Sequence, residues 1–180
     1  MRATTGALPK WFAGPIGLAV LGVDQFTKSW VGSAFGPGQE RRGVAMLGDL
    51  LEVRYVENRG AAFGMLRGEA MILSLLAISL TVGLLIYFWR LEGAPVATIA
   101  GVGLIAGGAV GNLADRLRMG FVVDFISVGA WPTFNLADSA ITIGVASLAF
   151  SLLRDERPRP ARSRDVGSGA ITRSGRSVDG

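Results

Sequence analysis

The chain has 180 residues, 50% of them hydrophobic, and a formal net charge of +4. It contains no histidine and no cysteine, which excludes a Ser-His-Asp relay, a thiolate nucleophile, a disulfide and metal centres built on those ligands. Soluble domains of this length rarely carry so much hydrophobic sequence, and carboxylates are the side chains best suited to any chemistry the chain performs.

The first apolar segment, residues 11–23, runs directly into Asp24. Basic residues before an apolar run are typical of a signal peptide, but here polar residues replace the small-residue cleavage site. We therefore predict a membrane span at about residues 11–30, in which Asp24 either anchors the helix end or faces a site inside the protein. Lys28 fits an interface residue that extends its charge into water.

Residues 31–69 form a connection that is too long for a simple turn. Within it, residues 47–56 hold apolar side chains between turn-forming residues, which predicts one or two strands of a small sheet at the membrane surface. Asn58 and Gly60 then open a segment of small residues. Because asparagine and glycine tolerate left-handed backbone, this segment fits close contact with an extended ligand as well as an ordinary tight turn.

Two uncharged segments follow, at residues 70–88 and 96–113. Each meets the roughly 17 to 25 residues that cross a hydrocarbon core, so we predict spans at about 70–89 and 96–114. In the later span, glycine recurs at every fourth position, a spacing that lets helices approach closely in lipid. These glycines are Gly103, Gly107 and Gly111.

The end of this span carries three polar side chains, Asn112, Asp115 and Arg116. Helical spacing brings them to the same end of the helix. Asp115 and Arg116 fit a pair with one another or with neighbouring groups as well as substrate contact. Asn112 fits the satisfaction of buried backbone groups as well as contact with a peptide.

Two aspartates stand in apolar surroundings. Asp124 is the one polar residue within residues 121–126. Asp138 shares a helical face with Asn135 in a last predicted span, at about residues 134–153. Two carboxyl groups that meet in a partly desolvated place tend to share one proton, so one can activate water while the other protonates a carbonyl oxygen. The same pair could instead relay protons through a transporter.

Four spans place both termini on one side of the membrane. More than half of the 18 Lys and Arg lie in the N-terminal segment, the short connection after the second span and the C-terminal tail, so the positive-inside rule favours cytoplasmic termini. Residues 154–180 are rich in Arg, Pro, Ser and Gly, which predicts a disordered tail. Since this tail lacks interleaved aromatic residues, we expect attraction to anionic lipids and no binding of nucleic acid.

The sequence thus predicts a mainly α-helical membrane protein. Residues 1–153 would form one domain of four transmembrane helices, with a small extracytoplasmic β-sheet and loop region at about residues 31–69.

Four blocks of sequence, spread in order over about residues 11–153, match the pattern of one known family. The blocks are Val23-Asp24-Gln25 with Lys28, Asn58-x-Gly60-Ala61-Ala62-Phe63, Gly108-x-x-Gly111-Asn112-x-x-Asp115-Arg116-x-x-x-Gly120-x-Val122-x-Asp124-Phe125, and Phe134-Asn135-x-Ala137-Asp138. Together they resemble the lipoprotein signal peptidases, also called signal peptidase II. Each block alone is a weak or moderate signal, and the specificity lies in their combination.

The resemblance implies an aspartic endopeptidase of the bacterial inner membrane, with its site near the extracytoplasmic face. It would remove the signal peptide of a prolipoprotein just before a cysteine that carries diacylglycerol. Asp124 and Asp138 would be the catalytic dyad. Further residues would order the site or bind the substrate: Asp24, Asn58, Gly60, Asn112, Asp115, Arg116 and Asn135.

This chemistry needs no metal and no organic cofactor. The expected partners are the diacylglyceryl-modified prolipoprotein and membrane lipids, and the expected state is a monomer. A small proton-coupled transporter is the alternative, although four spans without a visible inverted repeat count against it. A third class, a noncatalytic membrane assembly factor, would tolerate changes at both aspartates.

Overall fold

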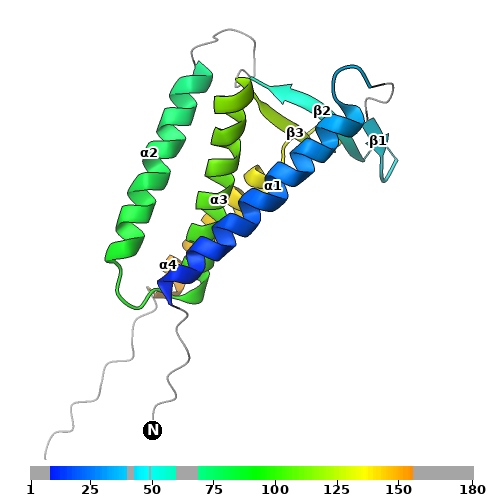
Figure 1. Ribbon diagram of the computed structural model, residues 1–180. Coiled ribbons are helices and arrows are strands. Elements are labelled where there is room, and N and C mark those ends of the chain that lie inside the picture. The colour runs from blue at the N-terminus through cyan, green and yellow to red at the C-terminus, as the bar shows by residue number, and fades with distance from the viewer. Residues whose placement is uncertain (1–8, 40–42, 49, 60–68, 156–180) are drawn as a thin grey trace, which may run out of the picture.

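Four long helices and a three-stranded sheet form the fold (Figure 1). The computed structural model describes residues 9–39, 43–48, 50–59 and 69–155, except for the side chains of 69–77 and 155. The elements are a 3-10 helical turn Lys10–Phe12, α1 Ala13–Phe35, β1 Gly43–Ala45, β2 Leu51–Asn58, α2 Glu69–Arg90, α3 Val96–Met119, β3 Val122–Val128 and α4 Leu136–Asp155. The prediction of a mainly α-helical chain with a small sheet is confirmed. Gly60 and the predicted tail from residue 156 onward lie outside the described residues.

Helix α3 is the centre of the bundle, and α1 runs in the same direction and crosses it obliquely at very short distance (Figure 1). A Cβ atom on Gly103 would lie 2.7 Å from the carbonyl oxygen of Ala13, and one on Gly111 would lie 2.6 Å from Oδ2 of Asp24. Gly107 faces α1 in the same way, against Gly17. The predicted packing role of the glycine row is therefore confirmed, since any side chain in the row would push α1 away.

Helix α4 packs antiparallel to α3. Near the start of α3, the hydroxyl oxygen of Thr98 lies 2.9 Å from that of Ser151 near the end of α4, and both groups are buried. Farther along α3, a Cβ atom on Gly108 would lie 2.5 Å from the carbonyl oxygen of Ala137. The first turn of α4 is thus held against the middle of α3.

The strands form an antiparallel sheet in the order β1-β2-β3, at the end of the bundle where α3 ends (Figure 1). A strand was predicted within residues 47–56, and β2 overlaps this range. β3 was not predicted as a strand, because its residues are apolar without alternation. The structure gives the reason: five of the seven residues of β3 are buried and none is exposed, so both faces of the strand are covered.

An apolar cluster packs the bundle at the end away from the sheet. Phe88 of α2 is buried there with Ile99 and Val102 of α3. Among the described residues, α3 and residues 136–154 of α4 are long and apolar enough to cross a membrane, and residues 78–90 of α2 form a shorter apolar stretch. The predicted number of four spans stays a prediction.

Candidate active site

Asp124 on β3 and Asp138 on α4, here called the central aspartates, meet on one residue. The side-chain amide of Asn135 donates to Oδ1 of Asp124 over 2.7 Å, and the backbone N–H of Asn135 donates to Oδ2 of Asp138 over 3.3 Å. Asn135 and Asp124 are buried, whereas Asp138 is partly exposed. The fold therefore brings the two aspartates together, with Asp138 on the accessible side.

The start of α4 holds Asp138 through a reciprocal pair of hydrogen bonds. Oδ1 of Asn135 accepts the backbone N–H of Asp138 over 2.9 Å, while the Asp138 carboxylate accepts the backbone N–H of Asn135. This is a capping box with Asn and Asp in place of the usual Ser or Thr and Glu or Gln. It keeps the Asp138 side chain at the helix N-terminus, where the helix dipole stabilises negative charge.

Strand β2 supplies a second amide to Asp124. The antiparallel register pairs Asn58 with Val122, two residues before Asp124, so Asn58 and Asp124 are diagonal neighbours on one face of the sheet. Nδ2 of Asn58 donates to Oδ2 of Asp124 over 2.8 Å. With the bond from Asn135, each oxygen of Asp124 accepts a hydrogen bond from an amide.

Asn112 of α3 contacts the other carboxylate oxygen of Asp138. Its Nδ2 donates to Oδ1 of Asp138 over 2.8 Å. Its Oδ1 accepts hydrogen bonds from Nζ of Lys28 over 2.8 Å and from Nδ2 of Asn135 over 3.1 Å. An ammonium group can only donate, so Lys28 fixes which end of the Asn112 amide faces Asp138.

The prediction that Lys28 extends into water at the interface is wrong. Its side chain is 3% exposed, and its Nζ lies 2.8 Å from a carboxylate oxygen of Asp24 and 2.8 Å from one of Asp115. The lysine is buried because two carboxylates neutralise it inside the protein. Asp115 thus pairs with Lys28, a neighbouring group, and of the two pairings that the sequence left open the one with Arg116 is not the one found.

Asp24 and Asp115 each accept a backbone N–H just before one of the central aspartates. Oδ1 of Asp24 accepts the N–H of Ala137 over 3.0 Å, and Oδ2 of Asp115 accepts the N–H of Val123 over 3.4 Å. Lys28 contacts both carboxylates. One ammonium group therefore connects, through two carboxylates, the helix and the strand that carry the central aspartates.

Burial raises the pKa of Asp124 from its ordinary value to about 6. Loss of hydration is the largest cause, and the neighbouring charge of Asp138 acts in the same direction. Hydrogen bonds from Asn58 and Asn135 and the charge of Lys28 oppose this rise in pKa. Asp124 is therefore suited to hold a proton at mildly acidic pH.

Asp138 borders two hollows in the protein surface. One, of about 450 Å³, lies among α2, α3 and α4 and is mainly aliphatic, with Asn112, Arg116 and Asp138 at its polar end. The other, of about 460 Å³, lies between residues 131–134 and the outer face of α4, near Ser139 and Thr142. A long ligand with apolar parts fits beside Asp138, because both hollows open at that side chain.

The predicted site residues fall into three groups. Those within the hydrogen-bonded network are Asp24, Asn58, Asn112, Asp115, Asp124, Asn135 and Asp138. Arg116 lines the aliphatic hollow beside Asp138, and Gly60 lies outside the described residues.

Among the described residues, no cluster of three or more histidine, cysteine or carboxylate side chains is arranged to hold a metal ion.

Sequence reasoning missed the roles of Lys28 and Gln25. Nε2 of Gln25 donates to Oδ1 of Asp115 over 2.9 Å and to the carbonyl oxygen of Gly111 over 3.2 Å. A helical signal for Lys28 was present, since Asp24, Lys28 and Val31 are spaced i, i+4 and i+7 and form one buried face of α1.

Gly111 is the point where α3 must remain without a side chain for this network to form. A Cβ there would lie 2.6 Å from Oδ2 of Asp24, so Gly111→Ala is expected to displace Asp24 and cost about 1–3 kcal/mol of folding stability. Thermal unfolding of the purified protein in detergent measures this loss. Gly22→Ala is the matched control on α1, because a Cβ at Gly22 meets nothing within 4 Å; equal stability of the two variants would contradict the prediction.

Two carboxyl groups held together by shared amides, beside helices long and apolar enough to cross a membrane, fit the class of membrane-associated aspartic hydrolases. The family described as "Signal peptidase (SPase) II" matches residues 16–154. The chain therefore belongs to the signal peptidase II family, and it is an enzyme of the aspartic peptidase type. This membership gives no support to the transporter alternative.

Similar proteins agree with this assignment. The chain is 44% identical to the lipoprotein signal peptidase of Syntrophomonas wolfei, over 77% of this chain and 90% of that protein. It is 39% identical to the lipoprotein signal peptidase of Pelotomaculum thermopropionicum, over 81% and 93%. A solved bacterial membrane enzyme, 30% identical, superposes with a TM-score of 0.71 over 80% of this chain and 94% of its own. The chain is thus similar to bacterial membrane enzymes in both sequence and fold.

Proposed function

We propose that the central aspartates form a catalytic dyad that removes the signal peptide from diacylglyceryl-modified prolipoproteins, with cleavage just before the lipidated cysteine. The observation that carries this proposal is the contact of both carboxyl groups with Asn135. The relatives' names, which specify lipoprotein signal peptidases, support the substrate class.

In the first step, the Asp138 carboxylate takes a proton from a water molecule as the water oxygen attacks the scissile carbonyl carbon. Asp124, whose pKa is raised by burial, gives its proton to the carbonyl oxygen, so a neutral gem-diol forms. In the second step, Asp124 takes a proton back from one hydroxyl while Asp138 donates its proton to the leaving amide nitrogen. The C–N bond breaks, and both side chains return to their starting protonation states.

The amides around the dyad keep both carboxyl groups in place during these steps. Asn112 and Asn135 donate to Asp138, and Asn58 and Asn135 donate to Asp124. Arg116, beside Asp138 in the aliphatic hollow, is placed to donate to carbonyl oxygens of the substrate backbone. Every one of these residues belongs to one chain, so a monomer suffices.

The proposed enzyme crosses the bacterial inner membrane with all four helices and has both termini in the cytoplasm. The sheet and the dyad then lie at the extracytoplasmic end, because the strands and the start of α4 are at the same end of the bundle (Figure 1). This placement suits a substrate whose signal peptide and acyl chains approach laterally from the bilayer. The aliphatic hollow beside Asp138 can receive such apolar segments.

The decisive test compares two substrates for the purified, reconstituted protein. A diacylglyceryl-modified precursor is expected to be cleaved, and the same precursor without the lipid is expected to react much more slowly, because the apolar groups that position the scissile bond are missing. Mass spectrometry of the new N-terminus measures the cut site. Comparable cleavage of both precursors would contradict the proposed substrate class.

Activity should also depend on the proton held by Asp124. Because its pKa is about 6 and the protonated form is the donor, kcat/KM is expected to fall as pH rises above about 6, by up to tenfold per pH unit. Initial rates with a lipidated precursor at pH 5.5 to 8.5 measure this fall in kcat/KM on the alkaline side. A rate that stays constant through that interval would rule out Asp124 as the proton donor.

A further inference from the structure

A third hollow lies at the end of the bundle away from the sheet. It has a volume of about 430 Å³ and separates α1 from α2, with α3 as its floor. Small residues of α1 and α3, among them Gly14, Gly17 and Gly103, leave it open, while Phe88 of α2 closes one side. We call this hollow the α1–α2 groove. It shares no residue with the hollows beside Asp138.

The lining of the α1–α2 groove is apolar except for Lys10 at its mouth. In a membrane, lipid tails are as apolar as the aliphatic side chains, so the lining itself distinguishes poorly between lipids. An acyl chain is the apolar occupant available to a groove on membrane-embedded helices. Any preference for one lipid must therefore come from contacts between the lipid headgroup and the residues at the mouth of the groove.

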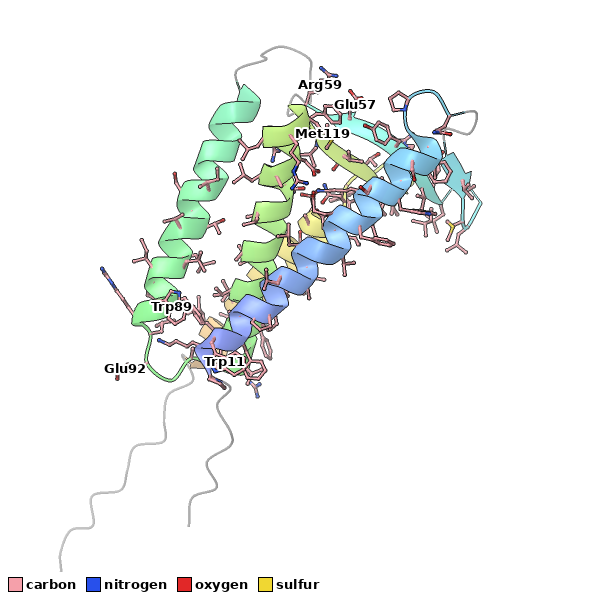
Figure 2. All side chains as sticks on the ribbon, viewed as in Figure 1. Trp11, Glu57, Arg59, Trp89, Glu92 and Met119 are labelled. Carbon is pink, nitrogen blue, oxygen red and sulfur yellow. The ribbon has the colours of Figure 1, made fainter. Side chains whose placement is uncertain are left out.

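Aromatic and cationic groups surround that mouth. Trp11 and Trp89 both line the groove, and Figure 2 shows them at the same end of the bundle. Tryptophans of this kind are typical of the level of lipid headgroups. Nζ of Lys10 donates to the carbonyl oxygen of Trp89 over 3.0 Å, which fixes the ammonium group at the mouth.

The charge at the mouth suits a phosphate. An ammonium group has three donors, so Lys10 keeps two N–H groups after its bond to Trp89. Arg90, the last residue of α2, is also exposed but lies outside the groove lining, so Lys10 is the cation that the lining itself provides. Glu92, an exposed acid at this end, lies in the connection after α2, outside the groove lining (Figure 2). The groove thus combines an apolar slot with a cation at its opening.

We propose that the α1–α2 groove binds an anionic phospholipid, with one acyl chain in the slot and the phosphate at Lys10. This rests on the membrane insertion in the proposed function, but it concerns the opposite end of the enzyme from the dyad. The ligand here is a resident bilayer lipid. It is chemically distinct from the substrate, which the dyad would process at the other end.

The test uses quenching of tryptophan fluorescence by lipids brominated in their acyl chains. Trp30→Phe and Trp131→Phe are introduced together, so that Trp11 and Trp89 report on the groove. The full chain is reconstituted in phosphatidylcholine vesicles that contain either brominated phosphatidylglycerol or brominated phosphatidylcholine at equal mole fraction. One cation at a membrane surface favours an anionic lipid about fivefold, so the relative binding constant for phosphatidylglycerol should exceed that for phosphatidylcholine by about that factor.

Two pairs of variants distinguish the contribution of Lys10 at the mouth of the groove from that of its apolar lining. Lys10→Gln should abolish the preference, while Arg154→Gln, which removes a cation at the end of α4 outside the groove lining, should retain it. Gly14→Phe should fill the apolar part of the groove and reduce quenching by both lipids, because Gly14 lines the groove and a Cβ there meets nothing within 4 Å. Gly22→Phe, equally unhindered on α1 but outside the lining, should leave quenching unchanged.

Equal quenching by both lipids in the parent chain, or an unchanged preference in Lys10→Gln, would overturn the proposal. Quenching by neither lipid would overturn it as well. Asp124→Asn keeps the result separate from the proposed function: it is expected to remove precursor cleavage and leave lipid preference intact. A parent chain that fails to cleave precursor but shows the Lys10-dependent preference would contradict the peptidase proposal and support the groove.

Discussion

Asp124→Asn and Asp138→Asn are each expected to lower kcat for precursor cleavage by about 10²–10⁴-fold. The asparagine cannot exchange a proton with water or with the carbonyl oxygen, although it keeps nearly the same shape. Because the two groups pass protons in one cycle, the double variant should be little slower than either single variant. Initial rates with a diacylglyceryl-modified precursor, at saturating substrate, measure the effect.

The fold should survive these substitutions. Burial already favours the neutral form of Asp124, and an asparagine at position 138 can still accept the backbone N–H of Asn135. Thermal unfolding in detergent is therefore measured beside the rates. Glu92→Gln, which removes an exposed carboxylate at the far end of the bundle, is the matched control and should keep full activity (Figure 2). A single dyad variant with the parent rate would contradict the proposed mechanism.

Asp124, Asp138 and Asn135 could be predicted from local sequence, whereas Asp24, Asn58, Asn112 and Asp115 became site candidates through the resemblance to a known family. Asp124 and Asp138 interrupt apolar runs, and Asn135 precedes Asp138 by the three residues of a capping box. The long helices followed from uncharged runs of membrane-spanning length. These signals are contained within one segment each, so a single sequence is enough to read them.

The role of Lys28 could not be read in the same way, because its environment is assembled from distant segments. Asp115, which neutralises Lys28 together with Asp24, comes from α3. Asn112, also on α3, accepts a hydrogen bond from Lys28. A lysine near the end of an apolar helix extends into water unless such partners exist. The β3 strand was missed for a related reason: covering both of its faces removes the alternation by which strands are recognised.

The partners of Lys28 explain why the central aspartates stay in register although they belong to different elements. The helix that carries Asp138 is held through Asp24, and the strand that carries Asp124 is held through Asp115. Lys28 is common to both links and also orients Asn112. A positioning role follows, in which Lys28 acts on the reaction through the groups it contacts and not on the substrate.

Lys28→Met is expected to lower both stability and kcat. Loss of the ammonium leaves two buried carboxylates without their cation, which costs about 3–5 kcal/mol when one partner of a buried pair is removed. The Asn112 amide also loses the donor that fixes its orientation toward Asp138, so kcat should fall in the molecules that remain folded. Thermal unfolding and initial rates, corrected for the folded fraction, measure the two losses.

Two variants and a pH profile separate positioning from simple loss of stability. Lys28→Met with Asp115→Asn restores the original net charge of the buried cluster, so part of the stability should return while kcat stays low. Lys10→Met, at the only other lysine of the chain, is the control and should retain both the parent stability and the parent kcat. Since the charge of Lys28 lowers the pKa of Asp124, its removal should raise that pKa and move the alkaline limb of activity to higher pH, a shift that instability alone does not produce. If the Lys28→Met enzyme kept the parent kcat and the parent pH profile, the positioning role of Lys28 would be contradicted. The helices and strands alone would then hold the two aspartates in place.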